Sequence, residues 1–198
     1  MNKEILCKNL EKRGFTPHVF PDRKAAADYL AENIHGVTVG IGGSVTVQAL
    51  DVYDRLSENN TVHWNWRNPQ PDTRKKAAEA EVYLTSANGV SESGELVNID
   101  GFGNRVAPTL FGPKKVYFIV GKNKVEPDIH AAIRRARNVA GPLNARRLGR
   151  KTPCAVGELK CHDCSSPERI CNGEVVLRGR PTSIGECHVL IVEEDLGF

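Results

Sequence analysis

The chain has 198 residues, with 27 Lys or Arg against 24 Asp or Glu, which gives a formal net charge of +3. With 40% hydrophobic and 26% charged residues, the composition excludes disorder as the main state and is that of an ordinary globular protein. Apolar runs are shorter than the roughly 20 residues that a bilayer requires, the first residues do not form a secretion signal, and the basic residues are dispersed. We therefore expect a cytoplasmic protein with neither a membrane nor a nucleic-acid partner.

The first half of the chain is predicted to alternate helices with strands. A helix over 2–13 is ended by Gly14, and a second helix begins at Asp22 and ends before Gly36. The apolar, β-branched run 37–41 is typical of a buried strand. The elements expected next, in order, are a helix over 44–58, a strand over 61–66, a helix over 72–81 and a strand that runs from 81 into a loop near 90.

The second half is predicted to contain more strand. From 90 to 120 glycines separate short runs, which predicts hairpins, and 114–120 is the clearest central strand. An amphipathic helix is predicted over 128–140, before Pro142. The runs 174–179 and 186–198 contain two final strands that we expect to close the sheet. This order predicts an α/β sandwich whose strands are part parallel and part antiparallel.

A glycine-rich loop follows the strand at 37–41. Gly42 and Gly43 permit a tight turn, and Ser44 begins the next helix, whose first N–H groups and positive dipole end favour an anion. The hydroxyls of Ser44 and Thr46 add further donors. The loop lacks the lysine of a P-loop and the third glycine of a dinucleotide-binding fingerprint, so neither ATP nor NAD is predicted. The alternative is an ordinary turn in which Ser44 only caps the helix.

Four cysteines fall within 18 residues, at Cys154, Cys161, Cys164 and Cys171. Their spacing is C-x6-C-x2-C-x6-C, in a segment over about 150–173 that shows no periodicity and is predicted to be an insertion in one domain. In a reducing compartment such a group indicates metal or catalysis before disulfides. Two other cysteines, Cys7 and Cys187, are expected to be core or surface thiols.

Either of two metal centres is compatible with this spacing. Four thiolates bind one tetrahedral zinc ion, or one iron each of a [4Fe–4S] cluster. A zinc ribbon places two C-x2-C knuckles far apart, and only Cys161 and Cys164 have that spacing here. Because the segment is rich in small residues that let backbone amides approach the sulfurs, we favour the [4Fe–4S] cluster, with zinc as the alternative.

A polar segment over 94–105 supplies candidate catalytic residues. Glu95, Asn98, Asp100 and Arg105 lie there among glycines. A carboxylate, an amide and a guanidinium are the base, donor and clamp that a small anionic substrate requires. Glycine hairpins rich in Asn and Asp are also common as plain turns, and on the local pattern alone the plain turn is the favoured interpretation, because turn chemistry explains these residue types.

Several stretches of the sequence resemble the LUD domain, the lactate-utilisation family. They are GIGGSVTVQAL, VYLTSANGVSESGELVNIDGFGNRVA, FGPKKVYFIVGKNK and RRARNVAGPLNARRL. The tail TPCAVGELKCHDCSSPERICNGEVVL and the end VEEDLGF resemble the stand-alone bacterial branch, which carries a C-terminal four-cysteine motif. The resemblance extends over essentially the whole chain.

The resemblance implies both a fold and a role. It implies a three-layer mixed-sheet sandwich of the NagB/RpiA/CoA-transferase-like type, in which the glycine loop (Gly42, Gly43, Ser44 and Thr46) handles anionic ligands. It also implies a link to the oxidation of L-lactate to pyruvate by a multi-protein system with iron–sulfur components. Members of that system generally lack the cysteine segment, so the resemblance implies that the stand-alone branch has redox or ligand chemistry of its own.

The sequence therefore predicts a LUD domain over 1–198 that binds a [4Fe–4S] cluster and a small carboxylate or phosphorylated ligand. The ligand would lie between the glycine loop and the polar segment, and a redox partner protein would serve the cluster. The alternative is a non-catalytic ligand-binding or regulatory protein with a structural zinc site. Fold analogy alone offers a weaker third option, an enzyme that uses CoA or a sugar phosphate. The substrate and the oligomeric state remain open.

Overall fold

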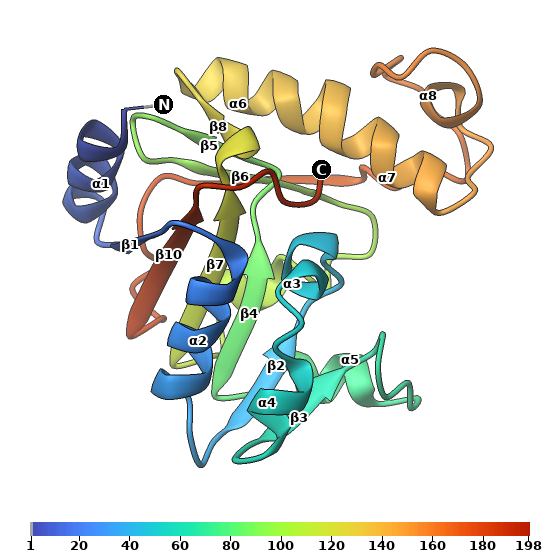
Figure 1. The fold of residues 1–198 in the computed structure, drawn as a ribbon. Coiled ribbons are helices and arrows are strands. Elements are labelled where there is room, and N and C mark those ends of the chain that lie inside the picture. The colour runs from blue at the N-terminus through green and yellow to red at the C-terminus, as the bar shows by residue number, and fades with distance from the viewer. Residues whose placement is uncertain (1) are drawn as a thin grey trace.

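The structure is a computed structural model that describes residues 2–198. Within these residues, six parallel strands form the main sheet (Figure 1). Their order across the sheet is β1 (Thr16–Phe20), β10 (Glu186–Val192), β7 (Lys115–Gly121), β4 (Val82–Ser86), β2 (Thr38–Ile41) and β3 (Thr61–Trp64). Because all six strands run in one direction, their carboxyl ends meet at a single edge of the sheet.

Three helices cover one face of the main sheet. They are α2 (Arg23–Asn33), α3 (Val45–Ala49) and α4 (Tyr53–Ser57), which lie in front of the strands in Figure 1. Leu30, Val47 and Leu56 from these helices belong to one buried cluster with Leu84 and Ile119 of the sheet. Such fully buried parallel strands are apolar on both faces, which explains the runs of β-branched residues in the sequence.

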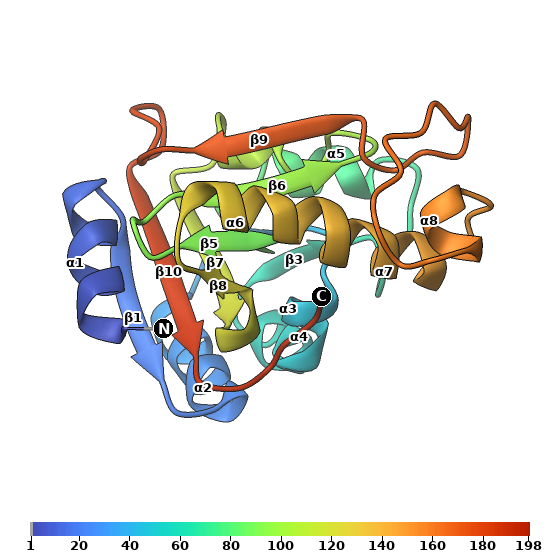
Figure 2. The same ribbon diagram turned by 90° about the horizontal axis from the view of Figure 1, so that it is seen from above.

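The opposite face is covered by α1 (Lys3–Lys12), α5 (Thr73–Ala78) and a second sheet, seen from above in Figure 2. The second sheet has the order β8 (Val125–Glu126), β5 (Gly89–Ser91), β6 (Leu96–Asp100) and β9 (Gly173–Leu177). Leu6 and Leu10 of α1 and Leu96 of β6 belong to one buried cluster with Phe118 and Val189 of the main sheet.

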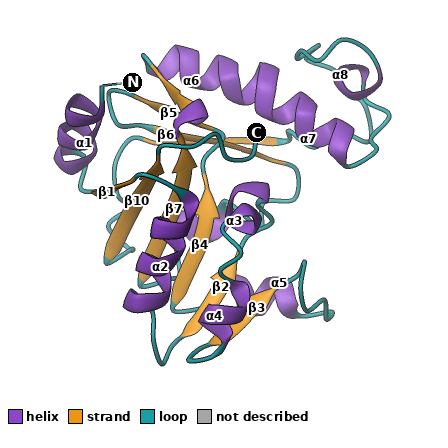
Figure 3. Cartoon of the chain, in the orientation of Figure 1, coloured by secondary structure: helices purple, strands orange, loops and turns teal. Residues whose placement is uncertain are grey.

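The outer face of the second sheet packs against one long helical segment. It consists of α6 (Ile129–Arg135), a π-helical turn (Ala136–Ala140) and α7 (Gly141–Arg147), and it buries Ala132 and Ala136 against Val97 and Ile99. A short helix, α8 (Pro153–Val156), follows, and Figure 3 shows that the rest of the cysteine segment is loop. The molecule is a three-layer α/β sandwich, as predicted. Its main sheet is parallel, and its second sheet is mixed, with β5–β6 and β6–β9 antiparallel and β5–β8 parallel.

Several predicted elements differ from the structure. The helix expected over 44–58 is two helices, because Asp51 adopts a left-handed conformation with φ of 50°. The run at 105–111 is not a hairpin strand but contains a 3₁₀ turn, Ala107–Thr109. The final run at 186–198 supplies β10 in the interior of the main sheet, between β1 and β7, and does not close an edge.

β1 and the last part of the helix that ends at Arg147 were not predicted. No strand was expected at β1, which is an edge strand with half-exposed residues and therefore has little apolar pattern. The helix expected to stop at 140 continues through Pro142 to Arg147. A proline inside a helix removes one hydrogen bond and crowds the carbonyl four residues earlier. Here that carbonyl belongs to the π-helical turn, whose wider winding accommodates the ring.

None of the helices within residues 2–198 has the length and apolar character needed to span a membrane.

A histidine pair, with His188 buried and His18 half-buried, lies between the main sheet and α2. His18 Nε2 is 3.0 Å from His188 Nδ1, and His188 Nε2 is 2.9 Å from Glu186 Oε2. Burial lowers the pKa of both imidazoles, and the neighbouring His188 lowers that of His18 further. The folded state therefore favours the neutral form of each ring.

This pair predicts acid sensitivity. Because the pKa of each ring is lower in the folded state than in the unfolded chain, their contribution to stability is complete above the unfolded value of about 6.5 and is lost as the pH falls below it. The free energy of unfolding, measured with urea between pH 5 and pH 8, should decrease on acidification. His18→Gln should flatten this dependence, and an unchanged pH profile would contradict the assignment.

Candidate functional site

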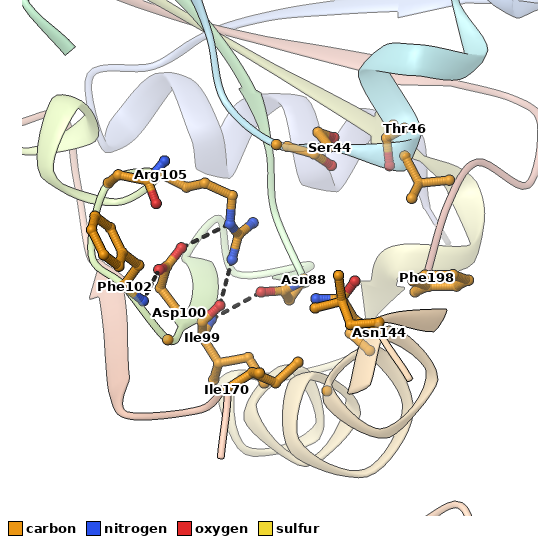
Figure 4. Close-up of a pocket in the computed structure, with 18 of the residues that line it drawn as sticks. Ser44, Thr46, Asn88, Ile99, Asp100, Phe102, Arg105, Asn144, Ile170 and Phe198 are labelled. Atoms are coloured by element: carbon orange, nitrogen blue, oxygen red, sulfur yellow. Dashed lines mark hydrogen bonds and ion pairs between the residues drawn. The ribbon is translucent and has the colours of Figure 1, made fainter. Parts of the chain in front are cut away.

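The carboxyl ends of β2, β4 and β7 open into a cavity of about 410 Å³. The loop after β6 and the helix α7 close it from the opposite side, so the cavity lies between the main sheet and the second sheet (Figure 4). Crevices at the carboxyl edge of a parallel sheet are the usual ligand sites of open α/β folds. The position alone makes this cavity the candidate site.

The glycine loop forms one wall of the cavity, as the sequence suggested. Gly43, Ser44 and Thr46 line it, whereas Gly42 lies behind, where a Cβ would come within 2.6 Å of the Tyr83 hydroxyl. Ser44 Oγ accepts a hydrogen bond from Val47 N at 3.2 Å and so caps α3. The loop therefore presents mainly backbone to the cavity, because the Ser44 oxygen is engaged in the cap and the Thr46 hydroxyl donates to Leu196 O and accepts from Lys124 Nζ.

Lys124 is a cavity residue that the sequence analysis missed. It lies in a 3₁₀ turn (Lys122–Lys124) just after β7, is 2% exposed, and its Nζ is 2.6 Å from Thr46 Oγ1 and 2.9 Å from Ser86 Oγ. Burial, and then the charges of Arg135 and Arg105, lower the pKa of its ammonium to about 7. The sequence did contain a signal for Lys124. The segment KNK (122–124) follows the clearest predicted strand, and the end of that strand lies at the same sheet edge as the glycine loop.

Two of the four candidate catalytic residues line the cavity. Asp100, at the end of β6, accepts hydrogen bonds on Oδ1 from Phe102 N at 2.9 Å and Gly103 N at 2.7 Å, which folds the following loop. Its Oδ2 lies 2.7 Å from Arg105 Nε, at an angle that suits an ion pair rather than a hydrogen bond. Arg105 also donates to Ile99 O at 2.6 Å (Figure 4).

The other two candidates lie outside the cavity. Glu95 pairs with Arg13 of α1, with Oε1 2.5 Å from Nη2, and accepts hydrogen bonds from Ser91 and Ser93. Burial opposes its ionisation, but these partners outweigh burial and hold the pKa of Glu95 below its usual value. Asn98 is 4% exposed on β6, and its Oδ1 has no hydrogen-bond partner within residues 2–198. Glu95 thus ties α1 to the second sheet.

Positive charge dominates the lining of the cavity. Among the described residues, six basic side chains line it against one carboxylate side chain, that of Asp100, and of these basic side chains only Arg105 has a carboxylate partner. They are those of five arginines, which carry the positive charge, and of Lys124: Arg74, Arg105, Arg147, Arg150, Arg169 and Lys124. Two of them lie over aromatic rings, Arg147 at 5.1 Å from the Trp66 centroid and Arg74 at 5.4 Å from that of Phe102. A concave site with this charge attracts anions.

The four clustered cysteines line a second, smaller pocket. Cys161 Sγ accepts a hydrogen bond from Asp163 N at 3.4 Å, and Cys154 Sγ lies 3.3 Å from Thr152 Oγ1. Asp163, between Cys161 and Cys164, has φ of 45°, so the C-x2-C turn depends on a left-handed residue. Within residues 2–198, no three Cys, His, Asp or Glu side chains are arranged to hold a single metal ion.

The two pockets share a wall. Ile99, Gly141, Arg169 and Ile170 line both of them. The Arg169 guanidinium donates to the carbonyls of Cys164 at 2.9 Å and Cys171 at 3.2 Å. The cysteine segment and the cationic cavity therefore contact the same side chains. Cys7 and Cys187 lie elsewhere, on α1 and β10, and burial raises the pKa of each thiol.

Comparison with known proteins identifies the family. The profile of the LUD domain matches residues 3–192. The chain belongs to the LUD domain family. A solved structure, that of a DUF162 family protein from Deinococcus radiodurans, superposes with a TM-score of 0.58 at 12% sequence identity, covering 96% of this chain and 94% of that one. At 12% identity, this structural similarity supports the fold alone. A comparison with curated proteins found no match.

The hydrogen bonds of Asp100 predict different outcomes for two substitutions. Asp100→Asn retains an Oδ1 acceptor for the two loop amides, whereas Asp100→Ala leaves both amides without it. Both variants lose the ion pair with Arg105, so this loss does not contribute to the difference in stability between them. We expect Asp100→Ala to lower the free energy of unfolding by about 1–3 kcal/mol more than Asp100→Asn. Urea denaturation measures the difference, and equal stabilities would show that the loop does not depend on Oδ1.

Proposed function

We propose that this LUD domain protein binds a small anion, a carboxylate or a phosphorylated compound, in the cationic cavity. The observation that carries the proposal is the charge of the lining, with five arginines and Lys124 against one carboxylate side chain among the described residues. Unpaired cations held together in one concave site repel each other, so an anionic ligand relieves their repulsion. Within the predicted site, Arg105 faces the ligand and Asp100 orients Arg105.

Membership of the LUD family supports a role related to lactate utilisation. Lactate and its oxidised form, pyruvate, are small carboxylates, which fits the charge of the cavity. Arg147, held by Asn144 Oδ1 and stacked on Trp66, has a planar guanidinium suited to a carboxylate. We infer a component of 2-hydroxy-acid utilisation.

The donor set of the cysteine pocket fits an iron–sulfur cluster. Four thiols line one pocket, and an amide N–H already points at a sulfur, an interaction that tunes such clusters. A zinc ion would require all four sulfurs within about 2.3 Å of one point, whereas a cubane gives each sulfur its own iron and accepts wider spacing. Cys154, Cys161, Cys164 and Cys171 would hold the cluster. When bound, it would supply electron exchange with a redox partner protein, or a Lewis-acidic iron.

Anion binding has a direct test. Calorimetric titration with pyruvate, L-lactate and inorganic phosphate, in a buffer that contains none of them, should show saturable binding to at least one. Arg147→Gln should weaken that binding about ten-fold or more, because a hydrogen bond to a charged group is lost. The matched control is Arg134→Gln, on the exposed face of α6, which should bind as the unaltered protein does. No binding by any of the three anions, or equal effects of the two substitutions, would contradict the proposal.

The metal content tests the cluster. Protein purified without oxygen should contain about four irons and four sulfides per chain and absorb in the visible range. Cys161→Ser should lose iron and colour, whereas Cys7→Ser, which removes a thiol on α1, should retain both. Colour retained in Cys161→Ser would contradict the assignment. Zinc without iron would favour the alternative, a non-catalytic binding protein whose cysteine segment is folded by the ion.

A further inference from the structure

Lys124 is buried in a way that calls for a chemical explanation. Its side chain is 2% exposed, and within residues 2–198 no carboxylate forms an ion pair with it. A buried ammonium without a counter-charge is costly, so a lysine in this position is favoured in its neutral form. The elements packed around the cavity add positive charge near it, with Arg135 from α6 and Arg105 from the loop after β6.

The hydrogen bonds around Lys124 suit an amine better than an ammonium ion. Nζ donates to Thr46 Oγ1 and to Ser86 Oγ. The hydrogens of these two hydroxyls are directed elsewhere, to Leu196 O at 3.3 Å and to Ala87 O at 3.2 Å. A neutral amine has two hydrogens, and both are used. A third hydrogen would find no acceptor among the described residues, so the lone pair is left free at a residue that lines the cavity.

We propose that Lys124 is a nucleophile that forms an imine with the carbonyl group of a 2-oxo acid bound in the cavity. This inference rests on the proposed anion binding, because Arg105 and Arg147 hold the carboxylate while the adjacent carbonyl carbon meets the amine. A 2-oxo acid is the smallest class of ligand that presents a carboxylate and an electrophilic carbon side by side. Desolvation and neighbouring cations are a known means of activating a lysine for this reaction.

The reaction balances without any redox partner. The Nζ lone pair attacks the carbonyl carbon, a C–N bond forms, and the carbonyl π electrons move to oxygen. One of the two Nζ protons is transferred to this oxygen, which gives a hydroxyl group. The nitrogen lone pair then forms the C=N bond as the hydroxyl leaves, and the hydroxyl takes the second Nζ proton and departs as water. The hydroxyls of Thr46 and Ser86 lie within hydrogen-bond distance of Nζ and are placed to carry these protons.

Reductive trapping tests the proposal. The intact protein is incubated with pyruvate and cyanoborohydride at pH 7 to 8, and its mass and peptides are measured. We expect one reduced adduct per chain, located at Lys124. Lys124→Arg, which keeps a positive charge and cannot form the imine, should give none. Lys122→Arg, an exposed lysine in the same turn, should be labelled as the unaltered protein is, and L-lactate, which has no carbonyl, should give no adduct.

The outcomes separate this proposal from anion binding. Saturable binding of pyruvate without an adduct would refute the role of Lys124 and leave the anion site intact. Absence of both binding and adduct would refute both. An adduct located at another lysine, or one that persists in Lys124→Arg, would overturn the proposal. Lys124→Met, with thermal melting of each variant, distinguishes loss of the nucleophile from loss of the fold.

Discussion

Mutual repulsion among cations is the constraint on which the arrangement of the site depends. Backbone carbonyls help to hold several guanidinium groups around the site in position. Arg105 donates to Ile99 O, Arg135 to Asn88 O and Asn123 O, and Arg169 to Cys164 O. Carbonyl oxygens orient a guanidinium without cancelling its charge. The fold therefore fixes the geometry of the cations and leaves their charge available to a ligand.

The topology explains how residues distant in the sequence meet at this site. The parallel main sheet places the ends of β2, β4 and β7 at one edge, and with them the glycine loop, Ser86 and Lys124. The second sheet lies across that edge and contributes Asp100 from β6. The helix that packs on its outer face then carries the chain to the cysteine segment, so that the wall of the cavity is also the wall of the cysteine pocket.

Many helices and strands could be predicted, because hydrophobic periodicity and helix caps depend only on residues close together in the sequence. The helices capped by Asp22 and Ser44 begin where expected, and the apolar run at 114–120 is β7. Elements whose structure depends on distant contacts were missed. β1 forms because β10 provides a partner, and the helix passes Pro142 because a π-helical turn absorbs the proline.

In the candidate site, too, residues with local sequence signals could be predicted, and residues whose role depends on distant contacts could not. The glycine loop and the residues Asp100 and Arg105 could be singled out from the sequence, since turn chemistry and strand ends are local signals, but the ion pair between Asp100 and Arg105 was not predicted. Glu95 could not be assigned from the sequence, because its partner Arg13 lies 82 residues away. Lys124 was missed because a lysine after a strand is usually exposed, and only the packing of α3 and β4 around it shows that it is buried.

The most direct test of the account is a crystal structure of the protein purified without oxygen and grown with pyruvate, with diffraction data collected at the iron absorption edge. The account predicts electron density for a bound anion in contact with Arg105 and Arg147, and an iron signal among the four cysteines across the shared wall of Ile99 and Ile170. A cavity filled only by solvent, with the anion bound elsewhere, would contradict the central claim that this cationic cavity is the ligand site.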